Sequence, residues 1–409
     1  MKTIWLVNYY AMPPKLESRL RTIKFAYYLK KKGHNVRIIG SSAMHNKEMN
    51  LIGDGSRFLE ISYDGIDFIH IKTPSYRNNG ILRFLSLLVF HFRLHILRKR
   101  FTRPDVIVHT ALPPFGNITI CTARRLGAKY IAEVLDLWPE SFVAFGLINK
   151  RNPLLALAYR AERWLYLKAD EVVFSMEGGI DYIRDKKWDF DSGGNINLNK
   201  VHYINNGVDI AEFNHNMENY KLEDTDLNDN SFRVVYLGSI RLANDIRLLI
   251  DAANYLKKYS NIKFLIYGDG EEREFLEKYV ASESIINVKF KQKWIDPQFV
   301  PFVLSRSSLN ILNYRANSVE KYGGSQSKLF QYLASGKPIC SNLQYGNSLI
   351  NQHNLGMSMS FSTPQEYAEA ILTISKKDSD ELERICIDSR ELAKQFDYKA
   401  LANKLEELI

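Results

Sequence analysis

The sequence predicts two doubly wound α/β domains in tandem, and three observations support this fold class. A chain of 409 residues exceeds what a single core usually organises. Short, nearly continuous apolar runs alternate with helical stretches, which is the pattern of a parallel sheet covered on both faces. The alternating series occurs twice, separated by polar passages at residues 185–200 and 214–230. An apolar share of 45% with 25% charged residues is that of an ordinary folded soluble protein.

The first series predicts an N-terminal domain. Its strands are expected at residues 4–10, 36–40, 66–71, 105–110, 130–134 and 171–175. The helices between them are expected at residues 18–32, 81–99, 115–126 and 153–168. The apolar run at the N-terminus is short and interrupted by Asn8, so we interpret it as a buried first strand and not as a signal peptide.

The second series predicts another sheet with its own helices. Strands are expected at residues 232–240, 262–270, 288–293, 309–314 and 338–343. Helices are expected at residues 245–259, 271–281, 296–305 and 327–334. Two such sheets would form a cleft at the carboxyl edges of their strands, where doubly wound folds bind ligands.

The domain boundaries follow from the polar passages and from the last helical pattern. The junction is expected between residues 186 and 231, where the sequence has little apolar surface to bury. No strand follows the helical pattern near the C-terminus, so this segment is expected to pack back on the first domain. The predicted division is 1–195, 196–380 and a C-terminal helix at 381–409.

Cysteine content and net charge bound the function more weakly. Cys121, Cys340 and Cys386 are odd in number and lack ligand spacing, which fits a reducing cytoplasm and argues against structural disulfides or a zinc site. The net charge of +9 implies an anionic partner, but it does not choose between a nucleotide, a nucleic acid and membrane lipid.

Residues 81–103 join an apolar helical pattern to a basic cluster. The positive residues at its end are Arg98, Lys99, Arg100 and Arg103. Histidines and arginines interrupt the apolar run too often for a membrane-spanning helix, namely Arg83, His91, Arg93 and His95. Two interpretations remain open: an interfacial helix on an acidic bilayer, and a core helix with a solvated basic end.

The most informative stretch is YGGSQSKLFQYLASGKPI, residues 322–339. Gly323 and Gly324 allow a turn, and Ser325 or Ser327 is expected to cap the helix that follows. Free amides at that helix start, with Lys328 nearby, form an anion site. Taken alone, a capped helix after two glycines is more often plain structure, but this one comes late in the second strand and helix series.

Two further turns of the second domain follow predicted strands. Gly238 permits close backbone approach, and Arg241 after it can hold a diphosphate through forked hydrogen bonds. Gly268, Asp269 and Gly270 form a tight turn against which a base or ribose could lie, although this triplet alone is a weak signal. Three such turns at the carboxyl ends of one sheet favour a nucleotide site.

In the first domain, DLWPES at residues 136–141 follows a predicted strand. Asp136 and Glu140 supply carboxylates and Trp138 a stacking face, while a turn-capping role for Asp136 is the alternative. Glu133 lies two residues earlier, on the same face of the strand as a second candidate.

Two basic side chains of this domain are weaker candidates. His109 is a lone histidine at a strand end, for which a structural role is the simpler interpretation. Arg19 lies at a helix start that could face a phosphate, and an exposed first-turn arginine is the alternative.

These motifs carry a resemblance to a known family. Residues 236–252, 265–280 and 322–339 resemble the donor half of the family 4 glycosyltransferases, which are retaining enzymes of the GT-B architecture with two Rossmann-like domains. Residues 109–141 resemble the acceptor-domain segment of bacterial members that build O-antigen, lipopolysaccharide and capsule, and INNGVD at 204–209 is similar to the opening of their second domain. The resemblance covers essentially the whole chain, and the order of the motifs is specific.

The resemblance implies roles for individual residues. The donor is a nucleotide sugar, with UDP favoured over GDP or dTDP, and neither a cofactor nor a metal is implied. Implied donor-binding residues are Gly238, Ser239, Arg241, Asn244, Gly268, Asp269, Gly270, Gly323, Gly324, Ser325, Gln326, Ser327, Lys328 and Gln331. Implied acceptor-binding residues are Arg19, His109, Trp138 and Glu140, and implied catalytic residues are Asp136, Glu133, Arg241 and Lys328.

The chain departs from the family pattern at four positions. Two glutamates separated by seven residues mark the family, and here their places are taken by Gly323 and Gln331. The arginine and lysine that flank the diphosphate elsewhere fall on Ser239 and Asn244. Arg241, with Lys328, must then supply the positive charge. The departing phosphate oxygen would itself accept the acceptor's proton, so no dedicated base is needed.

The resemblance therefore implies a hexosyltransferase whose residues 1–195 bind the acceptor and whose residues 196–380 bind the nucleotide sugar. The implied acceptor is a saccharide on a polyprenyl diphosphate, at the inner face of the cytoplasmic membrane, with the protein peripherally attached. A nucleotide-sugar 2-epimerase of the same fold is the alternative. A dehydrogenase is disfavoured because no GxGxxG opens a first helix, and a nucleic-acid-binding module leaves the cleft unexplained.

Overall fold

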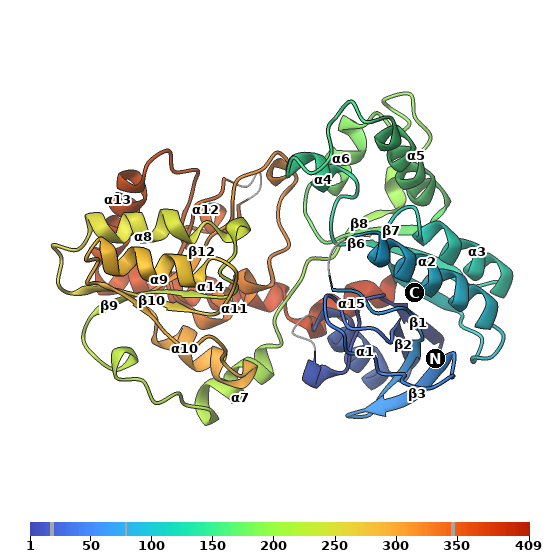
Figure 1. The fold of residues 1–409 in the computed structure, drawn as a ribbon, viewed down its shortest axis with the longest axis horizontal. Coiled ribbons are helices and arrows are strands. Elements are labelled where there is room, and N and C mark those ends of the chain that lie inside the picture. Colours follow the sequence, from blue (N-terminus) through green and yellow to red (C-terminus); the bar gives the residue numbers. More distant parts are fainter. Residues whose placement is uncertain (17–19, 78–79, 345–347) are drawn as a thin grey trace. The chain divides into compact units, whose positions relative to one another are not determined.

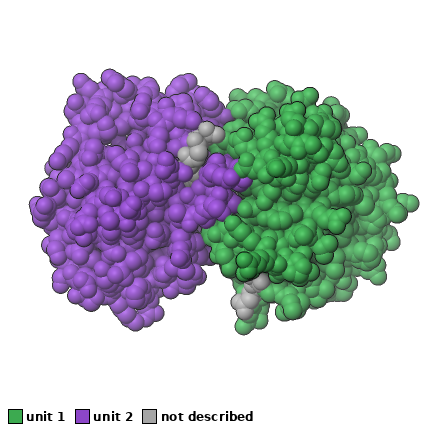
Figure 2. All heavy atoms as spheres, turned by 90° about the horizontal axis from the view of Figure 1, so that it is seen from above, with its two compact units in different colours: residues 1–205, 398–409 green, residues 206–397 purple. Residues whose placement is uncertain are grey.

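The computed structural model describes residues 1–16, 20–77, 80–344 and 348–409. The chain divides into two compact units, coloured separately in Figure 2. Unit 1 comprises Met1–Asn205 with Tyr398–Ile409, and unit 2 comprises Asn206–Asp397. The first unit thus extends to Asn205 and not only to residue 195, and the chain returns to it at Tyr398.

Unit 1 is built on one sheet with strand order β3-β4-β2-β1-β5-β6-β7-β8. Neighbouring strands are parallel except β3 and β4, which form an antiparallel hairpin at the edge. The strands are β1 (Thr3–Val7), β2 (Asn35–Ser41), β3 (Phe58–Tyr63), β4 (Ile66–Ile71), β5 (Val106–Thr110), β6 (Lys129–Val134), β7 (Glu171–Phe174) and β8 (Val201–Tyr203). The edge strand β3 was not predicted because its side chains are only half-buried or exposed.

Helices cover both faces of this sheet (Figure 1). They are α1 (Arg21–Lys31), α2 (Ile81–Leu97), α3 (Gly116–Leu126), α4 (Glu140–Ala144), α5 (Pro153–Lys168), α6 (Gly179–Asp185) and α15 (Tyr398–Glu407). α1 and α15 share one core cluster with Ile4 and Leu6 of β1. Successive strand residues point to opposite faces, and His109 of β5 accordingly meets His91 of α2, with ring centroids 5.1 Å apart.

Unit 2 has an all-parallel sheet with the order β11-β10-β9-β12-β13-β14. Its strands are β9 (Phe232–Leu237), β10 (Ile262–Tyr267), β11 (Val288–Phe290), β12 (Leu309–Leu312), β13 (Ile339–Ser341) and β14 (Gly356–Ser358). The order reverses between β9 and β12, where Leu309 pairs with Val234. Chain connections leave this switch point in opposite directions, so the carboxyl ends of β9 and β12 mark the expected ligand position.

The helices of unit 2 also lie on both faces of its sheet (Figure 1). They are α7 (Ile210–Asn219), α8 (Ile246–Tyr255), α9 (Arg273–Ser282), α10 (Val300–Arg306), α11 (Ser327–Ser335), α12 (Leu349–Gln352), α13 (Pro364–Ser375) and α14 (Ser379–Gln395). α8 and α13 share a core cluster with Val234 of β9, whereas α10 packs near the alternate residue Val235. These two units confirm the predicted fold class of two parallel α/β domains.

The C-terminal helical pattern is two helices and not one. α14 packs on α11 within unit 2, and only α15 contacts α1 of unit 1. The break falls at Phe396, whose buried ring lies 4.9 Å from that of Phe330 and whose carbonyl accepts a hydrogen bond from the Val208 amide at 3.0 Å. No glycine or proline marks this break, so the sequence pattern could not locate it.

Across the ranges given above, none of the helices combines the length and the apolar character that crossing a bilayer requires. α2 instead has two apolar faces. Leu87, Phe90 and Leu94 of one face are buried in unit 1, while the other face exposes Ile81, Leu82, Phe84, Leu85, Leu88, Phe92 and Ile96.

Replacement of Phe396 by alanine should destabilise unit 2. Truncation of a buried aromatic side chain typically costs about 3–5 kcal/mol, because transfer and cavity terms add. The free energy of unfolding should fall by this amount in urea denaturation. Ile387 on α14 is 61% exposed, and Ile387→Ala should change stability by less than about 0.5 kcal/mol. Equal effects of the two changes would contradict the anchoring role of Phe396.

Candidate functional site

The candidate site in unit 2 is centred on Lys328, in the first turn of α11. The Lys328 ammonium donates a hydrogen bond to the Tyr236 hydroxyl at 3.2 Å and lies 4.5 Å from the centre of that ring. The Tyr314 ring, just beyond β12, is 5.8 Å away. Burial lowers the pKa of Lys328 to about 8, because desolvation disfavours the ammonium form. A partly desolvated cation therefore lies at the carboxyl ends of β9 and β12.

Gly238 makes room for this lysine. A Cβ atom at Gly238 would lie 2.0 Å from Lys328 Nζ, and the residue has φ of +154°. Any other residue would displace the ammonium or strain the backbone. Gly238 was predicted to let a ligand approach the backbone closely. In the structure it lets the Lys328 side chain do so.

Gly268 and Gly270 of the GDG turn allow their loop to pack closely against the loop that contains Gly238. A Cβ at Gly268 would lie 1.8 Å from the Gly238 carbonyl oxygen, and one at Gly270 would lie 2.1 Å from that of Ile240. The Ile240 amide donates to the Asp269 carbonyl at 2.8 Å and joins the loops directly. Contact of this turn with a base or ribose stays a prediction.

The start of α11 differs from the predicted serine cap. The N-cap residue is Gln326, and its side chain makes no capping hydrogen bond. Ser325 is held elsewhere, because the Asn206 side-chain amide donates to its carbonyl at 2.7 Å and to its hydroxyl at 2.9 Å. The serine-cap prediction was therefore wrong. Without a side-chain cap, the first amides of the helix suit an anion.

The side chain of Gln326 and the backbone of Gly323 add to this picture. Gln326 Oε1 is buried without a hydrogen-bond partner among the described residues. Gly323 has φ of +90°, a conformation that favours glycine. Ser327 is exposed, and Gln331 lies half-buried one turn after Lys328 on the same side of the helix.

Ser239 and Asn244 replace the basic residues that flank the diphosphate elsewhere in the family, and their side chains make contacts within their own loop. Ser239 Oγ donates to the buried Asn244 Oδ1 at 3.1 Å, so these two side chains bond each other. Arg241 is exposed at the start of a short 3₁₀ turn, Leu242–Asn244. Arg315, which the sequence reasoning missed, is also exposed, and its amide donates to the Ala243 carbonyl at 2.9 Å. Arg315 could have been identified from the sequence as a basic residue directly after the strand expected at residues 309–314.

In unit 1, Glu133 belongs to a buried ion pair. Its carboxylate accepts from Arg21 Nε at 2.9 Å and from the Thr110 hydroxyl at 2.8 Å. Arg21 also donates to the carbonyls of Ile204 and Asn205. These contacts tie α1 to the ends of β5, β6 and β8. A catalytic role for Glu133 stays a prediction.

Glu140 and His109 are likewise held by neighbours. Glu140 accepts from the Tyr159 hydroxyl at 2.5 Å and from Lys186. Burial raises its pKa, but these hydrogen bonds outweigh burial, and the net pKa is lowered. His109 is buried, its Nδ1 lies 2.7 Å from the Tyr130 hydroxyl, and burial holds its pKa well below the usual value. His109 is therefore neutral at physiological pH.

Asp136 and Trp138 lie at the end of β6, and Asp136 is exposed. Trp138 is half-buried, with its ring 3.9 Å from that of Phe142 and 5.7 Å from the Arg83 guanidinium. Arg19 lies outside the described residues. No group of three or more His, Cys, Asp or Glu residues is placed to hold a metal in the part of the chain that the structure describes.

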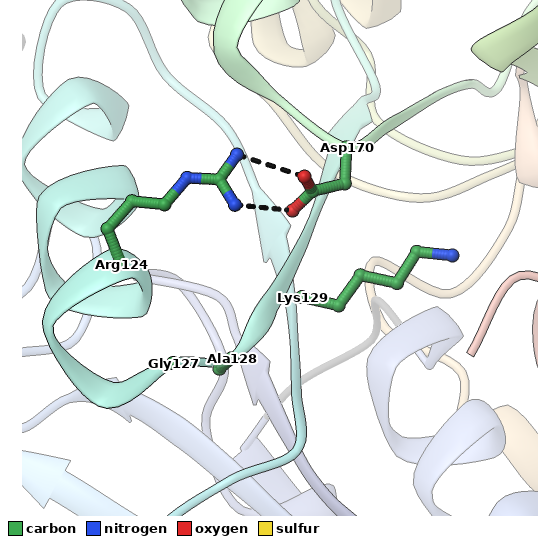
Figure 3. Close-up of a pocket in the computed structure, with 5 residues that line it drawn as sticks. All are labelled: Arg124, Gly127, Ala128, Lys129 and Asp170. Carbon is green, nitrogen blue, oxygen red and sulfur yellow. Dashed lines mark hydrogen bonds and ion pairs between the residues drawn. The ribbon is translucent and has the colours of Figure 1, made fainter.

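A surface cavity of about 390 Å³ lies elsewhere in unit 1 and is shown in Figure 3. It is lined by Arg124, Gly127, Ala128, Lys129 and Asp170. Arg124 and Asp170 pair across it at 2.9 Å. Lys129 begins β6, so this cavity is at the amino edge of the sheet, away from the carboxyl ends where doubly wound folds bind ligands.

Two family models match the chain. The model described as Glycosyltransferase Family 4 matches residues 21–212, and the model described as Glycosyl transferases group 1 matches residues 219–408. A comparison with curated proteins finds no match.

Solved structures share the fold over the whole length. Sucrose-phosphate synthase from Thermosynechococcus elongatus matches with a TM-score of 0.73 at 15% identity, over 100% of this chain and 98% of that chain. Anabaena HepE in complex with UDP and glucose gives 0.63 at 14%, over 100% and 99%. WaaG, a glycosyltransferase involved in lipopolysaccharide biosynthesis, gives 0.64 at 14%, over 99% of each chain. Identities this low show the fold alone.

The architecture is therefore the GT-B fold of glycosyltransferases, with one parallel sheet in each unit. The chain belongs to family 4 of these enzymes, a retaining family whose members use nucleotide-sugar donors.

Lys328 should titrate near pH 8 in the free protein. Reductive ¹³C-methylation and NMR should show one lysine resonance shifting near pH 8, while exposed lysines shift near about 10.4. Lys328→Arg should remove this resonance. Between pH 8 and 10.4 the unfolded chain binds more protons than the folded one, so Lys328 should make stability rise with pH in this window. A midpoint at the ordinary value would show that the ammonium is solvated.

Proposed function

We propose that the protein transfers a hexose from a nucleotide sugar, with UDP favoured over GDP or dTDP, to a saccharide on a polyprenyl diphosphate. The product would be an intermediate of bacterial surface polysaccharide, such as O-antigen, lipopolysaccharide or capsule. The observation that carries the donor half of this proposal is the Lys328 ammonium at the switch point of the second sheet. The Anabaena relative is described with UDP-glucose, which supports UDP.

Transfer must stabilise the negative charge of the departing nucleoside diphosphate. We assign this role to Lys328, Arg241 and the backbone amides of residues 324–327. Gln331, on the same side of α11 as Lys328, would hydrogen-bond the ribose. Since these groups are cationic or amide donors, the chemistry needs no metal. The leaving phosphate oxygen would take the acceptor's proton on the same face, in keeping with a retaining family.

The acceptor would bind to unit 1 at the carboxyl end of its sheet. Asp136 is exposed and Trp138 half-buried there, so both are accessible to a saccharide. Asp136 would contact an acceptor hydroxyl and Trp138 would cover a sugar face. Glu140, held by Lys186, would position this segment.

The exposed face of α2 supports peripheral attachment to the inner face of the cytoplasmic membrane. Ile81 is 87% exposed, Leu82 57% and Phe92 57%, which is unusual for apolar residues on one helix face. Arg98, Lys99 and Arg100 follow at the end of the helix. An apolar face beside positive charge suits an acidic bilayer.

The decisive experiment incubates the purified protein with UDP-, GDP- and dTDP-sugars and synthetic lipid diphosphate saccharides, with and without EDTA. We expect transfer that persists in EDTA, detected by mass spectrometry of the lipid product. Loss of transfer in EDTA, with recovery in magnesium or manganese, would contradict the assigned cations. Conversion of the nucleotide sugar to its 2-epimer without acceptor would favour the epimerase alternative instead.

Replacement of Arg241 by alanine should weaken binding of the donor diphosphate by about 1.5–3 kcal/mol, the range for a hydrogen bond to a charged group. Isothermal titration calorimetry with UDP, GDP and dTDP measures this. Lys257 is an exposed lysine just beyond the C-terminal end of α8, so Lys257→Ala should leave affinity unchanged. If the Arg241→Ala variant binds these nucleotides as tightly as the native protein, Arg241 does not bind the donor diphosphate.

Reversal of Arg98, Lys99 and Arg100 to glutamate should release the protein from acidic vesicles, because each basic residue adds about 1 kcal/mol of attraction near an anionic surface. High salt should act similarly through screening. The matched control reverses the exposed Lys257, Lys258 and Lys376 of unit 2, with the same change in net charge. If the native protein does not bind acidic vesicles, or if the variant with Arg98, Lys99 and Arg100 reversed still sediments with them, α2 does not attach the protein to the membrane.

A further inference from the structure

A polar and aromatic cluster occupies the carboxyl end of β1 in unit 1. Tyr10 follows this strand, and its ring centroid lies 5.1 Å from that of His45. His45 Nδ1 is 2.8 Å from the Tyr76 hydroxyl. Burial drives the pKa of Tyr76 well above its usual value, so its hydroxyl stays neutral. Segments far apart in sequence thus converge beside Tyr10.

Arg83 connects this cluster to the end of β6. It lies on the first turn of α2 and donates from Nε and Nη2 to the Tyr10 hydroxyl, at 3.1 and 2.5 Å. Its guanidinium carbon lies 5.7 Å from the ring centre of Tyr10 and 5.7 Å from that of Trp138. An arginine between two aromatic rings is oriented by cation–π attraction as well as by the hydrogen bonds.

The position of Arg83 joins two surfaces of different chemistry. Arg83, Tyr10 and Trp138 are all partly accessible at the carboxyl edge of the sheet. The residues on either side of Arg83 are apolar and exposed, Leu82 at 57% and Phe84 at 52%. An arginine fork is the side chain best matched to phosphate oxygens, and its neighbours suit an alkyl chain. One ligand with a phosphate group between a polar and an apolar part would satisfy both surfaces.

We propose that Arg83, oriented by Tyr10 and Trp138, binds the diphosphate of the lipid-linked acceptor, with the lipid leaving along the exposed face of α2 and the saccharide lying toward Trp138. This inference rests on the proposed function, which names a lipid-linked acceptor. It adds the residue that recognises the diphosphate. Arg83 is then a binding residue and takes no part in bond making.

The test compares Arg83→Ala and Arg83→Lys with the native protein. Arg83→Ala should raise the KM for a synthetic lipid diphosphate saccharide by about 10- to 100-fold, as expected for loss of charge-assisted hydrogen bonds. Arg83→Lys should recover part of this, since charge is kept and the fork is lost. Hydrolysis of the nucleotide sugar without acceptor should be unchanged. Arg125→Ala, an exposed arginine on α3, is the matched control and should behave as native.

A lipid monophosphate saccharide separates diphosphate recognition from a structural role. The native protein should prefer the diphosphate acceptor, and this preference should largely disappear in Arg83→Ala. Inorganic pyrophosphate should compete with the acceptor in the native protein and not in the variant. Binding to acidic vesicles without lipid diphosphate should weaken by no more than about fivefold in Arg83→Ala, the contribution of one basic residue near an anionic surface. A larger change in the acceptor KM than in vesicle binding distinguishes the diphosphate from the bilayer as the source of attraction.

Three results would overturn the inference. One is a native acceptor KM in Arg83→Ala. Another is an equal loss for mono- and diphosphate acceptors, which would indicate a structural role. The third applies if Arg83→Ala does not fold: Arg83→Lys would then prefer the diphosphate acceptor as strongly as the native protein does, which would equally contradict the inference. Transfer by the native protein only to soluble acceptors is a separate outcome, because it removes the lipid-linked acceptor of the proposed function itself and the Arg83 inference with it.

Discussion

The site in unit 2 depends on one desolvated ammonium. Lys328 fits against Tyr236 and Tyr314 only because Gly238 has no Cβ. The loop that contains Gly238 is in turn fixed by close approach of the next loop at Gly268. The carboxyl ends of β9, β10 and β12 and the start of α11 therefore form one packed assembly, and its charge lies where the strand order reverses.

Unit 1 uses its charges differently. Glu133 and Glu140 are both at or after the end of β6, yet each is held by a cation, Arg21 or Lys186. Removing one partner of the buried Arg21 pair would leave an uncompensated charge, so the pair helps to fix α1 against the strand ends. Carboxylates committed in this way are poorly suited to proton transfer. That is compatible with the mechanism we propose, in which the departing phosphate oxygen accepts the proton.

The core-helix interpretation of residues 81–103 holds for the buried face of α2, whereas the interfacial interpretation stays a proposal for the exposed apolar face. The histidines that interrupt the apolar pattern are not a polar surface: His91 is buried and lies 2.9 Å from the Thr119 hydroxyl, and His95 makes a similar contact with Thr122. The exposed face is consequently more apolar than the sequence pattern suggests. A helix of this kind can belong to the core and still expose an apolar face.

The sequence by itself determined the two α/β domains, most strands and helices, and the positions of the glycine turns, because periodicity and backbone requirements are local properties. Helix α5 and strand β4 occur at the predicted residues. Only the tertiary structure decided which groups meet. Tyr236 and Lys328 are 92 residues apart in the sequence, and Arg21 and Glu133 are 112 apart. Asn206, which hydrogen-bonds the Ser325 side chain that was expected to cap α11, is 119 residues away from it in the sequence. The break at Phe396 likewise depends on Phe330 of another helix. Burial and pairing of this kind arise between segments that are brought together only by folding, so no local pattern encodes them.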